Sequence, residues 1–83
     1  MARRSNYDVI ADMLRIKGTK TAVMYGANLS YSQAQRYLHL LEAQQLVRVV
    51  KRNDGRAEYQ ATEKGRRFLD LLETVESMTE NVA

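Results

Sequence analysis

The stretch from Asn28 to Glu42 constrains the fold of this chain more than any other. Ser30 is a favoured helix N-cap residue, and Gln33 three positions later can complete a capping box. At about 100° per residue, the side chains that follow divide into an apolar and a polar side. The apolar side holds Ala34, Tyr37, Leu38 and Leu41, and the polar side holds Ser32, Gln35, Arg36 and His39. We therefore expect an amphipathic helix over residues 30–44 with one packed and one open face.

The polar side of this helix favours contact with nucleic acid. Gln and Arg can make bidentate hydrogen bonds to adenine and guanine edges, and Ser can bond to bases or phosphates. The face combines uncharged donors with one Arg, whereas a solvated helix face usually carries Glu and Lys pairs. An ordinary solvent-exposed face is the alternative, and the helix alone does not decide between the two.

Two shorter segments precede this helix. Ser5 can cap a first helix over residues 6–17, because its apolar residues keep helical spacing and Gly18 follows it. A second short helix over residues 21–25 is expected to end at Gly26, directly before the capped helix. Two helices joined by a tight turn that contains Gly, the second with a polar outer face, predict a helix-turn-helix.

A β-hairpin is predicted after the amphipathic helix. β-branched residues over 46–51 and a second extended segment over 57–61 enclose Asp54-Gly55, a strong signal for a tight turn. Cations surround this turn, at Arg48, Lys51, Arg52 and Arg56. A cationic hairpin in this order favours a wing that follows the phosphate backbone or the minor groove of DNA. The alternative is a solvated edge hairpin protected from aggregation by its charge.

The last segment predicts a helix for dimerisation. Thr62 can cap it, and Gly65 would allow a close approach to the hairpin. Its apolar stripe repeats at spacings of three and four, as in a coiled coil, and covers about half of the helix. The stripe contains Phe68, Leu69, Leu71, Leu72, Val75, Met78 and Val82. We expect one side to pack on the preceding domain and the other on a second chain, with a frayed monomeric tail as the alternative.

Charge is distributed unevenly along the 83 residues. Residues 1–56 hold ten Lys and Arg against four Asp and Glu, whereas residues 57–83 hold three against six. A basic body is what neutralisation of phosphates requires, and the acidic tail should point away from a polyanion. Arg3 and Arg4 precede the first helix, from where they could also reach phosphates.

Catalytic and cofactor chemistry find no support in the residues. The chain has no Cys and a single His, His39, so a zinc site within one chain is excluded. We find no nucleophile motif, no glycine-rich phosphate loop and no convergent carboxylate pair, and we expect no enzyme activity, cofactor or small-molecule ligand. Without a long apolar run or a leader-like N-terminus, a cytoplasmic, nucleoid-associated protein is expected. Most tyrosines should lie inward as core or rim residues, with Tyr31 as the exception; the inward set is Tyr25, Tyr37 and Tyr59.

The chain also resembles a known family. The segment from Lys20 to Tyr31, followed by Tyr37-Leu38, Leu41, Tyr59, Thr62, Lys64-Gly65 and Phe68-Leu69, is similar to the archaeal winged helix-turn-helix proteins of about ten kilodaltons. The resemblance implies a three-helix winged domain, binding of double-stranded DNA, and dimerisation through an antiparallel coiled coil of the last helices. It places the groove helix at residues 30–44, the wing at 48–56 and the dimer helix at 63–78. These proteins usually have Gly where this chain has Gln45.

Together these observations predict a mainly α fold with one hairpin, divided into a winged helix-turn-helix domain over residues 1–62 and a dimerisation helix over 63–83. The predicted function is binding of double-stranded DNA as a homodimer, either as a transcriptional regulator or as a chromatin-type architectural protein. A protein-interaction module on a winged scaffold is the alternative. The residues predicted to contact DNA are Asn28, Ser30, Tyr31, Ser32, Gln35, Arg36, His39, Arg48, Lys51, Arg52 and Arg56. The residues predicted to form the dimer contact are Phe68, Leu71, Leu72, Val75 and Met78.

Overall fold

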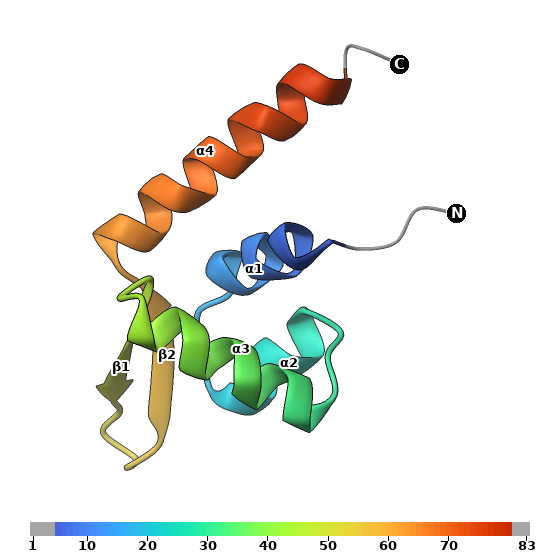
Figure 1. Cartoon of the computed structure of the whole chain (residues 1–83). Helices are drawn as coiled ribbons and strands as arrows, with labels where there is room; N and C mark the ends of the chain where they lie inside the picture. The colour runs from blue at the N-terminus through green and yellow to red at the C-terminus, as the bar shows by residue number, and fades with distance from the viewer. Residues whose placement is uncertain (1–4, 81–83) are drawn as a thin grey trace.

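The computed structural model describes residues 5–80, which form four helices and one β-hairpin (Figure 1). The elements are α1 (Asn6–Arg15), α2 (Lys20–Gly26), α3 (Tyr31–Ala43), β1 (Val47–Lys51), β2 (Ala57–Ala61) and α4 (Glu63–Glu80). The predicted fold class and order of elements are confirmed. The predictions made for Arg3, Arg4 and Val82 lie outside the described residues.

Local capping sets the start of three helices, as the sequence predicts. The Ser5 hydroxyl accepts a hydrogen bond from the Asp8 amide at 3.1 Å, and the Asp8 carboxylate accepts one from the Ser5 amide at 2.9 Å. Ser30 and Gln33 form the same reciprocal pair at the start of α3, at 3.2 and 3.0 Å. Thr62 caps α4, because its hydroxyl oxygen accepts from the Gly65 amide at 3.0 Å. These bonds satisfy amides that a helix leaves without partners in its first turn.

Helix α1 ends earlier than predicted, at Arg15 instead of Lys17. Ile16 is already extended, and Gly18 pairs with Tyr59 of β2: the Gly18 amide donates to the Tyr59 carbonyl at 3.2 Å, and the Tyr59 amide donates back at 2.7 Å. Gly18 therefore adds an isolated antiparallel bridge to the hairpin and does not act as a helix cap. The long-range pairing explains why helical spacing alone placed the boundary two residues late.

Helix α2 ends at Gly26, as the sequence predicts. In the turn to α3 the left-handed residue is Asn28, with φ of 56°. A Cβ on Gly26 would lie 2.6 Å from Cδ1 of Ile16, so a larger residue here would require the end of the Ile16 side chain to move. Asn is one of the few residues that tolerates a positive φ, because its short polar side chain can bond locally.

The core lies where α1, α2, α3 and the beginning of β1 meet. Its buried residues are Val9, Ile10, Ala11, Met13, Leu14, Val23, Ala27, Ala34, Leu38, Leu41, Leu46 and Val47. Tyr37 and Tyr59 are partly buried against it, as expected, but the prediction for Tyr25 is wrong: its side chain is 75% exposed. Helix α2 is seven residues long and buries only Val23, and Tyr25 lies about 200° further round this short helix.

The hairpin pairs β1 and β2 antiparallel, with Val47 opposite Ala61 and Lys51 opposite Ala57. Gly55 in its turn has φ of 86°, the conformation that Asp-Gly predicted. At the other end of the hairpin, Gly65 of α4 lies so close to Leu46 that a Cβ would collide with the Leu46 carbonyl oxygen. The close approach predicted for Gly65 is therefore confirmed.

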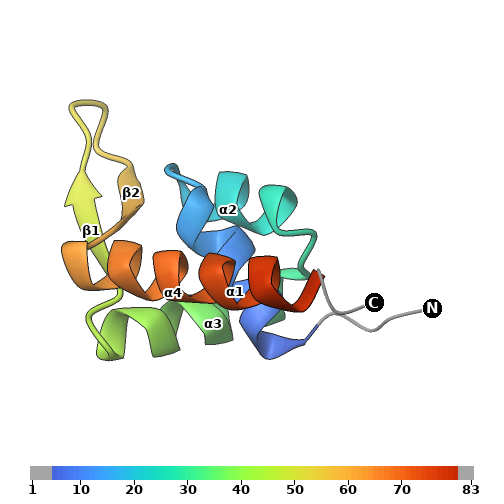
Figure 2. The same cartoon turned by 90° about the horizontal axis from the view of Figure 1, so that it is seen from above.

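Helix α4 packs on α1 with one side and runs beyond it, as Figures 1 and 2 show. Phe68 and Leu69 pack against the core, and the Arg15 guanidinium contacts the Glu73 carboxylate at 3.0 Å. None of the helices in residues 5–80 combines the length and apolar content needed to cross a bilayer.

Candidate functional site

The outer face of α3 is open along its whole length. Tyr31, Ser32, Gln35, Arg36 and His39 are all exposed and line one shallow surface hollow. The opposite face is closed, because Ala34, Leu38 and Leu41 are buried. The amphipathic division predicted for this helix is thus present, and it brings these five candidate residues onto one surface.

Two other candidates at the start of α3 have structural tasks. The Ser30 hydroxyl is engaged as the helix cap and lies 3.4 Å from the Ser32 hydroxyl. Asn28 takes the left-handed turn conformation and stays exposed. A role in DNA binding for either residue remains a prediction, and any contact by Ser30 would have to share its hydroxyl oxygen with the cap.

The turn of the hairpin is held by its own side chains. Asp54 Oδ1 accepts a hydrogen bond from the Arg56 amide at 3.0 Å. This bond holds the pKa of the Asp54 carboxyl below its ordinary value, and the charges of Arg52 and Arg56 act in the same direction. Arg52 lies 3.8 Å from Asp54 Oδ2 and 3.9 Å from Glu58 Oε2, so both of its carboxylate neighbours belong to the hairpin.

Strand alternation separates two of the predicted wing residues. Arg48 lies opposite Gln60, and Lys51 lies opposite Ala57. Residues three apart on a strand point to opposite faces, so Arg48 and Lys51 lie on different faces of the hairpin. The structure therefore does not bring Arg48 together with Lys51.

One cation that the sequence reasoning missed joins the site, Lys20 at the start of α2. Its Nζ lies 5.6 Å from the centre of the Tyr31 ring. It also lines a hollow of about 770 Å³ with Arg56 from the hairpin. The sequence shows a Lys in the first turn of a short helix, but only the packing of α2 beside the hairpin brings it next to Arg56.

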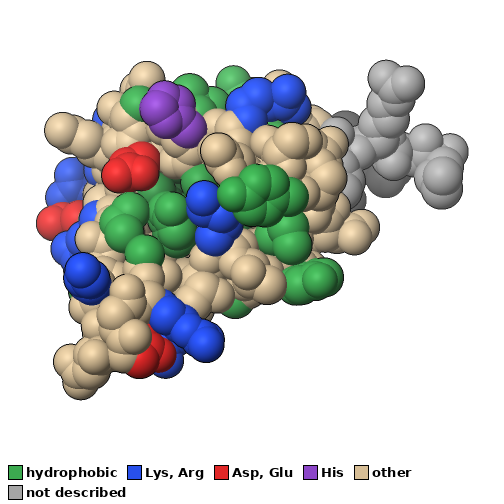
Figure 3. Space-filling view, turned by 90° about the horizontal axis from the view of Figure 1, so that it is seen from below, with side chains coloured by type: hydrophobic (Ala, Val, Ile, Leu, Met, Phe, Trp, Pro, Cys, Tyr) green, Lys and Arg blue, Asp and Glu red, His purple; other side chains and the backbone are tan. Residues whose placement is uncertain are grey.

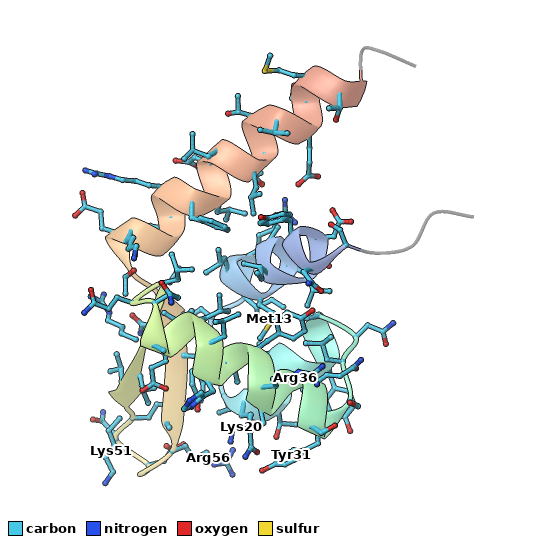
Figure 4. All side chains as sticks on the ribbon, viewed as in Figure 1. Met13, Lys20, Tyr31, Arg36, Lys51 and Arg56 are labelled. Atoms are coloured by element: carbon cyan, nitrogen blue, oxygen red, sulfur yellow. The ribbon has the colours of Figure 1, made fainter. Side chains whose placement is uncertain are left out.

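Cations without an ion pair gather around this surface. No described Asp or Glu forms an ion pair with Lys20, Arg36, Lys51 or Arg56, nor with Arg48 on the other face of the hairpin. In Figure 4, Lys20, Tyr31, Lys51 and Arg56 lie on the side of the molecule away from α4, and Figure 3 shows basic side chains spread over that side. We call this surface the basic face: Lys20, Arg36, Lys51 and Arg56 with the outer residues of α3.

The outer side of α4 has a different character. Leu71, Val75 and Met78 are 66%, 57% and 67% exposed. Phe68 and Leu72, also predicted as dimer residues, are partly covered within the chain. The apolar stripe is therefore divided: one edge packs on the chain itself, and the exposed stripe of Leu71, Val75 and Met78 is open. Within the described part of the chain, no three metal-ligating side chains come together.

Known proteins share the fold of this chain. The sequence profile of a winged helix-turn-helix family matches residues 3–80. The DNA-binding protein Sso10a-2 from Sulfolobus solfataricus superposes with a TM-score of 0.82 at 33% identity, over 95% of this chain and 85% of that one. No curated protein matched the chain.

More distant structures share the fold. The transcriptional regulator BldR from Sulfolobus solfataricus has a TM-score of 0.72 at 16% identity, over 92% of this chain and 57% of its own. The adhesin competence repressor of Streptococcus pyogenes has a TM-score of 0.74 at 15% identity, over 96% of this chain and 63% of its own. The chain thus spans less than two thirds of the length of these two regulators.

Proposed function

The chain belongs to the winged helix-turn-helix family, and from that premise we propose that it binds double-stranded DNA through the basic face. The observation that carries the proposal is that Lys20, Arg36, Lys51 and Arg56, from α2, α3 and the hairpin, lie on one side of the molecule without an ion pair among the described residues. A free cation can neutralise a phosphate and release a counterion without first giving up a carboxylate partner. The likeness to a DNA-binding protein at 33% identity supports the same function.

In this proposal α3 enters the major groove and the hairpin lies along the backbone. The major groove admits one α-helix, and its edges present donors and acceptors that Gln35 and Arg36 can address. Ser32 and His39 extend the same exposed row. Lys51 and Arg56 contact phosphates, which positions the protein without reading sequence. Arg52 contributes less, because Asp54 and Glu58 already neutralise it.

We further propose that the exposed stripe of α4 joins two copies of the chain. Leu71, Val75 and Met78 recur on one side of a helix that extends past the domain. A dimer would bury this side and would present two groove helices to two half-sites, about one helical turn of DNA apart. The proposed division of the chain is therefore a DNA-binding domain over residues 1–62 and a dimerisation helix over residues 63–83.

Arg36 is the sole Lys or Arg of α3, and we therefore infer a modest sequence preference. Each base read by a bidentate contact contributes about 1–3 kcal/mol of discrimination, and this face has few side chains that can supply it. A regulator with preferred sites discriminates strongly between DNA sequences, whereas a chromatin-type protein with broad coverage discriminates weakly. Genome-wide occupancy in the native host separates them: a few sharp sites indicate a regulator, and broad coverage indicates a chromatin protein.

Salt dependence is the direct test of DNA binding. Affinity for a duplex, measured by fluorescence anisotropy, should fall by a factor on the order of 10³ between about 50 and about 200 mM salt if a dimer neutralises six or more phosphates. Arg67→Gln is the matched control, since Arg67 is paired with Glu63 on α4. It should leave the salt slope, which is the slope of log affinity against log salt concentration, unchanged. An affinity for duplex DNA that does not change with salt would overturn the proposal.

A further inference from the structure

Lys20 is held in place before any ligand arrives. Its ammonium lies 5.6 Å from the centre of the Tyr31 ring, within the range of a cation–π contact. Tyr31 is 61% exposed, yet Lys20 itself is only partly exposed. The ring thus restricts a long side chain that would otherwise sample many rotamers, and less side-chain entropy is lost when a ligand binds.

Lys20 faces a hollow with a second cation on another element. The hollow between α2 and the turn end of the hairpin measures about 770 Å³, and Lys20, Thr21, Arg56 and Tyr59 contribute to its lining. No described Asp or Glu lines it. The Arg56 backbone is fixed on both sides: its amide donates to Asp54 Oδ1 at 3.0 Å, and its carbonyl accepts from the Arg52 amide at 2.7 Å.

Resting on the proposed DNA binding, we propose that this hollow holds a phosphate of the DNA backbone between Lys20 and Arg56, and that Tyr31 positions Lys20 for it. Two cations and the Thr21 hydroxyl suit a phosphodiester, which has a single negative charge and several acceptor oxygens. The positive charge comes from side chains of two elements. The backbone of α2 adds little, because Thr19 already caps the Ala22 amide at 3.3 Å.

The position of the hollow gives this phosphate a mechanical role. Lys20 belongs to the helix before α3, whereas Arg56 belongs to the hairpin, so one bound phosphate connects the helix-turn-helix to the wing. The contact carries no sequence information, because every nucleotide has the same phosphate. Tyr31 is then a positioning residue for Lys20 and not a platform on which a base stacks.

The test compares salt slopes of duplex binding for variants of the full chain. Lys20→Gln should lower the slope by about one and weaken random and preferred duplexes equally, by about tenfold. Tyr31→Leu should reproduce part of that loss, and Tyr31→Phe, which keeps the ring, should restore it. In the Lys20→Gln background, Tyr31→Leu should add little, because the two residues act as one unit. Far-UV circular dichroism shows whether each variant is folded.

Several results would overturn this assignment. If Lys20→Gln keeps the wild-type slope while Lys51→Gln lowers it, the DNA-binding proposal stands and the hollow is not a phosphate site. If Tyr31→Phe weakens binding as much as Tyr31→Leu, the hydroxyl and not the ring makes the contact. Competition with inorganic phosphate is the remaining test. If phosphate binds tightly and displaces duplex DNA, the hollow is a site for free anions. A wild-type affinity that does not change with salt would instead contradict DNA binding itself.

Discussion

Helices α3 and α4 are both amphipathic, but the chain covers them to different extents. Helix α3 buries Ala34, Leu38 and Leu41, and its outer face is polar with a single Arg. Helix α4 leaves Leu71, Val75 and Met78 open, and it has no basic residue after Arg67. An uncovered polar face near free cations suits a polyanion, whereas an uncovered apolar stripe among carboxylates suits another protein surface.

The cations of these two regions differ in what they contact. Helix α4 and the hairpin both contain several Lys and Arg. On α4, Arg67 pairs with Glu63 at 3.1 Å, and Lys64 donates to the Gln44 carbonyl at 2.7 Å. Lys51 and Arg56 of the hairpin have no ion pair among the described residues. Arg66 of α4 also has no ion pair among the described residues, so the basic face differs from α4 in where its cations gather and not only in whether they are paired.

The exposed stripe of α4 can be tested with Val75→Glu, for which we expect the largest effect. Burying an unpaired carboxylate costs at least about 2 kcal/mol, and a symmetric dimer would bury two. The dimer dissociation constant should rise by about 10³-fold. Sedimentation equilibrium should then show the mass of a single chain, 9.6 kDa.

Ser77→Glu is the matched control, because it adds the same charge two residues further along α4 and so about 160° away from Val75 round the helix. It should leave the mass of the wild-type assembly unchanged. A wild-type chain that sediments as a monomer at all concentrations would contradict the dimer. The exposed stripe would then be a candidate contact surface for a different protein.

The junction between the two regions is tested with Gly65→Ala. The new Cβ would collide with the Leu46 carbonyl oxygen, so α4 would have to move away from the start of the hairpin. We expect the free energy of unfolding in urea to fall by about 3 kcal/mol. Arg66→Ala, at the next and exposed position, should change it by less than about 0.5 kcal/mol. Equal unfolding midpoints for the two variants would show that the contact is not tight.

The division of labour within the basic face is tested by Arg36→Ala against Lys51→Ala. Loss of Arg36 should weaken a preferred duplex by about 2 kcal/mol and random duplexes by less, because a bidentate base contact is removed. Loss of Lys51 should weaken all duplexes equally and lower the salt slope by about one. The opposite result is a sequence-dependent loss for Lys51→Ala and a uniform loss for Arg36→Ala. It would mean that the hairpin reads bases and α3 contacts the backbone.

The smallest expected effect concerns Gln45, which connects α3 to β1 with φ of 61°. Replacing a non-glycine residue in this conformation by Gly should stabilise the fold by about 1 kcal/mol in urea unfolding. The neighbouring Gln44 has φ of −87°, so Gln44→Gly should give no gain. A loss of stability in Gln45→Gly would show that its side chain contributes more than the strain costs.

Local features of the fold could be predicted from the sequence because they depend on few residues. The capping pairs of Ser5 and Ser30 and the cap at Thr62 each involve groups three positions apart, and the positive φ of Gly55 depends on that residue alone. The resemblance to the winged helix-turn-helix family is likewise confirmed. The departure at Gln45 was visible too, since the family usually has Gly at a position that proves to be left-handed.

The wrong predictions concern the end of α1 and the burial of Tyr25. The end of α1 depends on the pairing of Gly18 with Tyr59, 41 positions later in the chain. This pairing does not follow from helical or strand spacing. Tyr25 is exposed because so short a helix presents only one buried face.

The sequence by itself determined the order of the elements, the polar face of α3 and the apolar stripe of α4, since periodicity and capping act along the chain. Only the tertiary structure decided which part of that stripe is left open and which cations are left without partners. It also brought Lys20 beside Tyr31 and across the hollow from Arg56. The physical reason is that packing and electrostatics depend on distances in space, which folding sets between residues far apart in the sequence.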